Sequence, residues 1–239
     1  MICLVGAFIY ASGICVLTRA ALGISPISSV PYVFTFVTGL TLGTCTMVLN
    51  AVLIIAQKLV FGRDFTAKII GMQIGISLVF SVFIDLGIWL FGWFAPATYP
   101  GRLLYLLFGC GVLALGMSMV VMANFVVLPG EGAVKCIVKY TGWEFGTAKV
   151  TFDSSMVTLA VVTSLVTMGR VQGVREGTVI ASILIGTFSK FIMRRFKGRM
   201  DLYLGYGTAD RTTVAAGTGA QRDKAPFAEM IPNNTEVLE

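Results

Sequence analysis

The chain has 239 residues, of which 56% are hydrophobic and only 13% are charged, with a net charge of +6 and no histidine. A soluble domain carries about a quarter charged residues, so this composition excludes an ordinary water-exposed surface. Apolar runs of about 18 or more residues are typical of helices that cross a membrane. The sequence therefore predicts an all-α membrane protein that is surrounded by lipid and does not bind nucleic acid.

Six apolar segments are long enough to cross a bilayer, at about 2–20, 42–61, 69–91, 103–125, 146–168 and 176–194. The first begins without a signal-peptide pattern, and its abrupt start favours a short cytoplasmic leader missing from this chain. Lys and Arg gather after the second span, near Lys135 and Lys139, and after the last span. The positive-inside rule then places both termini in the cytoplasm and the aromatic segment Trp89–Tyr99 at the outer interface.

Two shorter segments lie between spans, at about 25–38 and 129–141, and both are too short to cross the hydrocarbon core. In the first, Ser25 suits an N-cap, Pro26 the first helical position and Gly39 a C-terminal stop. Pro129 and Gly142 take the same positions in the second. Both segments are therefore predicted as short broken or re-entrant helices, which are tolerated in a membrane where protein or a wet cavity surrounds them.

The chain matches itself when it is shifted by 103 residues, mostly at small or special-backbone residues. The matched pairs are Gly6 and Gly109, Gly13 and Gly116, Pro26 and Pro129, Gly39 and Gly142, Gly43 and Gly146, and Asn50 and Asp153. After a small insertion, Gly62 matches Gly169 and Gly71 matches Gly177. The matches predict two repeats, at about 1–95 and 103–196. Each would contain three spans, an odd number, so the repeats would have inverted topology, as in many secondary transporters.

Polar residues at membrane depth are the candidates for binding a solute, namely Ser25, Ser28, Ser29, Asn50, Glu131, Lys149 and Asp153. Lys149 and Asp153 are four residues apart and share one helical face. A charge at this depth costs about 3 kcal/mol or more unless it is paired or hydrated. Two interpretations stay open: a structural ion pair, or the wall of a polar cavity with Asn50 as its counterpart from the first half.

Other charged residues have plainer interpretations. Lys135 and Lys139 suit positive-inside anchors, and Glu144 suits an interfacial residue. Asp85 has Ser81 about one turn away and Ser77 about two turns away. It is either a buried functional acid or a side chain that reaches the outer interface.

Residues 200–239 change in character, with Gly, Thr, Ala and mixed charges and little periodicity, which predicts a disordered cytoplasmic tail after a membrane domain at 1–199.

The blocks RAALGISPISSVPY, LPGEG and FGTAKVTFD together resemble the YczE-like bacterial integral membrane proteins, a group with YyaS- and YitT-type members. The resemblance covers most of Ile2–Arg199 and departs from the family pattern in the long tail. It implies a fold and a location in the bacterial inner membrane, and it does not imply a substrate.

Two functions remain open. The first is a secondary transporter or permease for a small polar or ionic solute. The second is a non-transporting accessory or scaffold protein, since GxxxG-like spacings (Gly39–Gly43, Gly71–Gly75 and Gly142–Gly146) allow close packing within the chain, in a homo-oligomer or with a membrane partner. An enzyme is disfavoured because the sequence has no histidine, nucleophile elbow, metal-ligand cluster or Walker-type loop. We therefore expect no catalytic residue, metal or cofactor.

Overall fold

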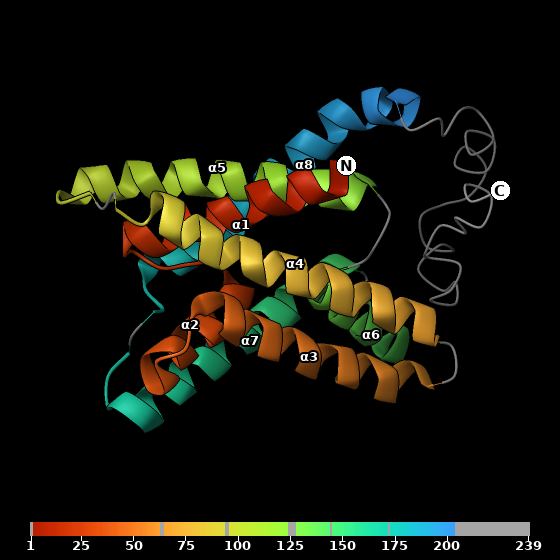
Figure 1. Cartoon of the computed structure of the whole chain (residues 1–239), viewed down its shortest axis with the longest axis horizontal. Coiled ribbons are helices and arrows are strands. Elements are labelled where there is room, and N and C mark those ends of the chain that lie inside the picture. The colour runs from red at the N-terminus through yellow and green to blue at the C-terminus, as the bar shows by residue number, and fades with distance from the viewer. Residues whose placement is uncertain are drawn as a thin grey trace.

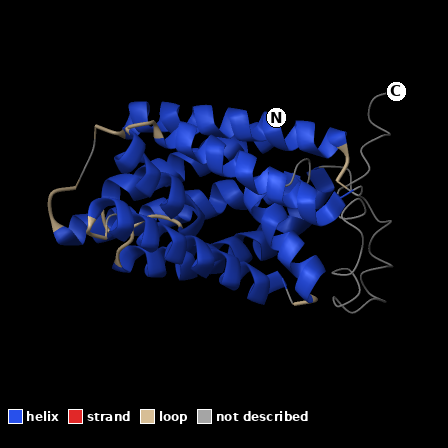
Figure 2. Ribbon diagram, turned by 90° about the horizontal axis from the view of Figure 1, so that it is seen from below, coloured by secondary structure: helices blue, strands red, loops and turns tan. Residues whose placement is uncertain are grey.

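The structure, a computed structural model, describes residues 2–62, 65–93, 96–123, 128–143, 145–171 and 173–203. Over these ranges the chain forms eight helices and no strand (Figure 1; Figure 2). They are α1 (Ile2–Ala20), α2 (Pro26–Thr38), α3 (Leu42–Phe61), α4 (Ala67–Phe91), α5 (Tyr99–Ala123), α6 (Pro129–Thr141), α7 (Phe145–Met168) and α8 (Glu176–Tyr203).

Among the described residues, five helices are long and apolar enough to cross a membrane: α1, α3, α4, α5 and α7. In α8 the described apolar stretch is shorter, at Ile180–Ser189. The chain is therefore a helical integral membrane protein. Helix α8 runs to Tyr203 rather than ending near 194, because helix-forming residues continue beyond its apolar part. The predicted tail boundary near 200 thus falls inside a helix, and residues 204–239 lie outside the described ranges.

The two short helices have the predicted bounds within one residue and closely similar ends. Each begins with proline after an extended residue, with φ −63° and ψ 146° at Ser25 and φ −61° and ψ 146° at Leu128. Each ends at a left-handed glycine, with φ 71° at Gly39 and φ 67° at Gly142. Only glycine adopts this conformation readily, which explains the stops. The 103-residue offset therefore recurs in the helix bounds.

The helices pack in two groups. Helices α1, α4, α5 and α8 share the largest apolar core, and α1 packs most extensively on α5 (Figure 1). Glycines at the α1–α5 contact allow close approach, because a Cβ at Gly13 would lie 2.6 Å from the backbone N and Cα of Leu113. A Cβ at Gly6 would lie 2.9 Å from the Cβ of Met119. The matching glycines Gly109 and Gly116 lie against α1.

The second group contains α2, α3, α6 and α7, and α3 joins it to the first by packing on α4. Helix α2 packs beside the second half of α7, where Val30 and Val33 cluster with Ala160. Helix α6 packs beside the first half of α7, where Val134 clusters with Phe152. Figure 1 accordingly shows α2 toward one end of the molecule and α6 toward the other. The two short helices are arranged end to end between α3 and α7.

Candidate functional site

The starts of the two short helices meet at mid-molecule, where the side chain of Ile27 contacts Gly130. A cavity of about 40 Å³ lies at this meeting point. Its walls come from both short helices and from α1, α3, α4, α5 and α7, and they are Tyr10, Ile14, Ile27, Ser28, Pro31, Thr46, Leu49, Asn50, Phe80, Met117, Leu128, Gly130, Glu131 and Lys149. A small cavity between the two short helices is therefore present in the protein.

Much of the wall comes from positions that the 103-residue offset relates. Four such pairs line the cavity: Ile14 and Met117, Ile27 and Gly130, Ser28 and Glu131, and Thr46 and Lys149. The two halves of the chain thus contribute corresponding positions to one space. Their chemistry differs, because the second half supplies charged side chains where the first half supplies hydroxyl groups.

The seven predicted site residues divide into those on the cavity and those beside it. Ser28, Asn50, Glu131 and Lys149 line the cavity. Ser25 precedes α2 and Ser29 lies in its first turn; both are buried, and neither is part of the cavity lining. Asp153 is also outside the lining, and it lies one turn beyond Lys149 on α7.

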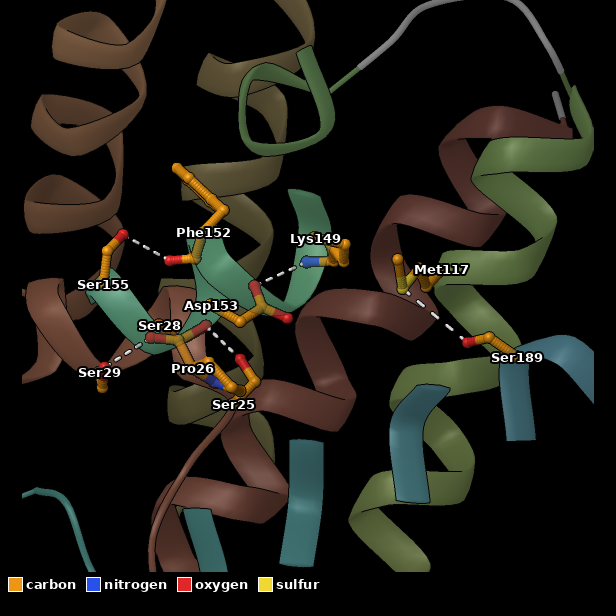
Figure 3. Close-up of polar contacts among 10 residues, drawn as sticks. All are labelled: Ser25, Pro26, Ser28, Ser29, Met117, Lys149, Phe152, Asp153, Ser155 and Ser189. Atoms are coloured by element: carbon orange, nitrogen blue, oxygen red, sulfur yellow. Dashed lines mark hydrogen bonds and ion pairs between the residues drawn. The ribbon is translucent and has the colours of Figure 1, made fainter. Parts of the chain in front are cut away.

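Lys149 and Asp153 form the ion pair that their spacing allows. The Lys149 Nζ donates to Asp153 Oδ1 at 2.8 Å, and the two side chains are 28% and 21% exposed (Figure 3). Because Lys149 also borders the cavity, the two interpretations of this pair do not exclude each other. Glu131, half-buried in the first turn of α6, is close enough to interact electrostatically with Lys149 and Lys135.

The hydroxyl groups at the start of α2 bond to one another and to the backbone. Ser25 Oγ donates to Ser28 Oγ at 2.8 Å, and Ser29 Oγ donates to the carbonyl of Pro26 (Figure 3). Ser25 has the N-cap position that was predicted, but its side chain makes no capping hydrogen bond. Leu128, at the same position of α6, cannot make one. Both helix starts therefore reach the cavity without a side-chain cap in the described structure.

Asp85 caps a neighbouring helix. Its Oδ1 accepts from the N–H of Gly43 at 2.8 Å, and its Oδ2 accepts from Thr41 Oγ1 at 2.7 Å. A carboxylate is favourable at a helix N-terminus, because the first N–H groups there lack helical partners. Asp85 thus fixes the start of α3 against α4. The structure favours neither of the two predicted interpretations, the functional acid or the interfacial side chain.

Two glutamines were missed by the sequence analysis. Gln57 Nε2 donates to the carbonyl of Pro129 at 3.0 Å, and Gln73 Nε2 donates to Gln57 Oε1 at 3.1 Å. Both side chains are fully buried. A buried amide needs partners, so these bonds tie the start of α6 to α3 and α4. The available signal was an amide side chain inside each of two apolar spans.

The remaining predicted residues that the structure describes are not part of the cavity lining. Lys139 Nζ is 4.7 Å from the ring centroid of Phe61, a cation–π contact near the end of α3. Lys135 is half-buried on α6, and Glu144 lies outside the described residues. A Cβ added at Gly71 or Gly75 would meet no atom within 4 Å, so this pair is not used for packing within the described chain.

Comparison with known proteins identifies a family but does not indicate a function. No curated protein and no solved structure matches the chain. One family model, described as a family of unknown function, matches residues 1–194, which include every helix that lines the cavity. The chain therefore belongs to the family of unknown function DUF6198.

Proposed function

We propose that the protein is a secondary transporter or permease for a small polar or ionic solute. In this proposal it crosses the bacterial inner membrane six times, as two inverted repeats with cytoplasmic termini, and α8 provides the sixth span. Helices α2 and α6 are re-entrant and enter from opposite sides. The matched helix bounds, the arrangement of α2 and α6, and the resemblance to YczE-like proteins support this proposal.

The observation that carries the proposal is the cavity itself. A charged side chain inside a membrane is costly, and where it occurs it usually marks a solute or ion pathway. Here Glu131 and Lys149 border one space together with the buried amide of Asn50. The space lies where two short helices meet, which is also where secondary transporters with broken helices bind their substrates.

The size of the cavity limits the solute. A single buried water needs about 10–15 Å³, whereas pockets for drug-sized ligands occupy about 300–1,000 Å³. At about 40 Å³, the cavity accommodates a few water molecules or a solute of a few non-hydrogen atoms. A larger solute would require the two halves of the chain to move apart.

The test is uptake into proteoliposomes that contain the purified protein, with a panel of small cations, anions and neutral solutes. We expect Lys149→Met to abolish the uptake that the wild-type protein supports, while the variant remains folded and inserted. Lys68→Met, the same change at an exposed position of α4, serves as the matched control and should retain uptake. Equal uptake by both variants, or no uptake of any solute by the wild-type protein, would contradict the proposal.

The accessory or scaffold function is favoured by a different observation. Gly71 and Gly75 are exposed on α4, and the close packing that this spacing permits is not used within the described chain. A partner helix would account for them. Gly75→Leu should then dissociate a stoichiometric partner or a homo-oligomer in a pull-down from mild detergent, whereas Gly186→Leu, the same change at an exposed glycine of α8, should not.

A further inference from the structure

We propose that the cavity binds a small anion, and that Glu131 takes up a proton when the anion enters. This inference rests on the proposed transport function and gives it a substrate class and a coupling ion. It follows from the charges and dipoles that surround the cavity.

Three positive elements face the cavity. A helix N-terminus carries about +0.5 of an elementary charge, and its first N–H groups have no partner within the helix. The first turns of α2 and α6 both reach the cavity through Ile27, Ser28, Gly130 and Glu131, and neither start has a side-chain cap. The third element is the ammonium group of Lys149 on α7. Broken helices that direct their N-termini at an anionic group are a known feature of transporter binding sites.

An independent observation points to a polar ligand for this space. The Asn50 side chain lines the cavity from α3, is only 6% exposed, and makes no hydrogen bond with any described residue. Buried polar side chains almost always have a partner, and an amide NH₂ group can donate to an anion. Tyr10 borders the same space from α1 and likewise has no hydrogen bond from its hydroxyl in the described structure.

The negative charges nearby explain why a proton must accompany the anion. The charge of Lys149 is balanced by Asp153, to which it is paired. The Glu131 carboxylate lies in the first turn of α6, so it balances the two helix starts when the cavity is empty. An added anion would then leave an uncompensated negative charge inside the membrane, which is strongly unfavourable. Protonation of Glu131 removes that charge.

The groups facing Glu131 support this assignment. Helix α7 presents Lys149, α6 presents Lys135, and α1 presents Tyr10, which is also near Asp153. The lining residues from α2, α3, α4 and α5 carry no formal charge. Glu131 is thus the carboxylate among the described lining residues. Its protonation is therefore the step that can remove a negative charge from the cavity wall.

The proposal predicts a specific pH dependence. If one proton binds with each anion, the apparent affinity falls by about tenfold for each pH unit above the titration of Glu131 in the empty protein. The probes are the sodium salts of chloride, nitrate and formate, each exchanged against gluconate at constant ionic strength. The readout is the dissociation constant from the shift in melting temperature between pH 5 and pH 9, followed by intrinsic tryptophan fluorescence.

Two variants and one control make the outcome decisive. Glu131→Gln, which resembles the protonated state, should bind the same anion with an affinity that no longer changes with pH. Lys149→Met should weaken binding by at least about tenfold at every pH, because a charge-assisted contact is lost. Lys68→Met should behave as the wild-type protein. If Glu131→Gln fails to fold, the slope measured on the wild-type protein still decides the question.

The results that overturn the inference differ from those that overturn the transport function. A wild-type protein that responds to none of the three anions, or an affinity independent of pH, contradicts the anion and proton assignment. If the protein then accumulates a cation or a neutral solute in proteoliposomes, the transport function stands and only this inference fails. If no solute of any class is taken up, both fail.

Discussion

Replacement of Gly13 by alanine tests the central contact of the fold, the close approach of α1 and α5. The added Cβ would lie 2.6 Å from the backbone N and Cα of Leu113, whereas ordinary contacts begin at 3.4 Å. The helices must therefore separate locally by about 0.8 Å, the difference between these distances. Because the atoms met are backbone atoms, no side-chain rotation relieves the overlap.

The magnitude follows from two opposing effects. Overpacking a tight contact costs about 1–3 kcal/mol, occasionally more, and a rigid backbone on the opposite side favours the upper end. Alanine in place of glycine inside a helix stabilises the helix by about 1 kcal/mol, which offsets part of this cost. We therefore expect Gly13→Ala to lower the free energy of unfolding by about 2 kcal/mol. The assay is reversible unfolding of the purified protein in mixed detergent micelles.

The control is Gly111→Ala on α5, where an added Cβ would meet no atom within 4 Å. That variant should be as stable as the wild-type protein or more stable by up to about 1 kcal/mol. Equal stability of the two variants would refute the reasoning, because α1 and α5 would then not approach as closely as the structure shows.

Substitutions at three groups of polar contacts are tested by the same unfolding assay. Lys149→Met and Asp153→Leu should each destabilise by about 1–2 kcal/mol, and the double variant should recover most of the loss; strictly additive effects would mean that the pair is not coupled. Asp85→Ala should cost about 1–2 kcal/mol because the start of α3 loses its carboxylate, and an unchanged unfolding midpoint would contradict that capping role. Gln57→Met should cost about 1–3 kcal/mol because it leaves the buried amide of Gln73 without its acceptor and removes one hydrogen bond to the carbonyl of Pro129. Gln73→Met should cost less, since Gln73 Oε1 already lacks a partner in the described structure, so equal losses would count against this network.

The positions of the helices were predictable because their causes are local. Apolar length specifies a span, proline sets a first helical position, and a glycine that must adopt positive φ sets an end. These signals placed α2 and α6 within one residue. The end of α8 was missed because helix propensity continues beyond the apolar stretch, where hydrophobicity no longer marks the helix.

The roles of individual polar residues were predictable only in part. Spacing placed Lys149 and Asp153 on one helical face, and their bond follows directly from that spacing. The same local signals could not show that Asp85 reaches the start of α3, because Thr41 and Gly43 lie more than 40 positions earlier in the chain. They also could not separate Gly43, which packs against α4, from the outward-facing Gly75.

Local sequence thus determined that this protein is a helical membrane protein and where most of its helices lie along the chain. The tertiary structure alone decided which polar side chains meet. A membrane helix is apolar around most of its circumference, so periodicity does not reveal which face contacts which neighbour. The cavity depends on that choice, since it exists only where the starts of α2 and α6 come together against α3 and α7 and bring Asn50, Glu131 and Lys149 to one space.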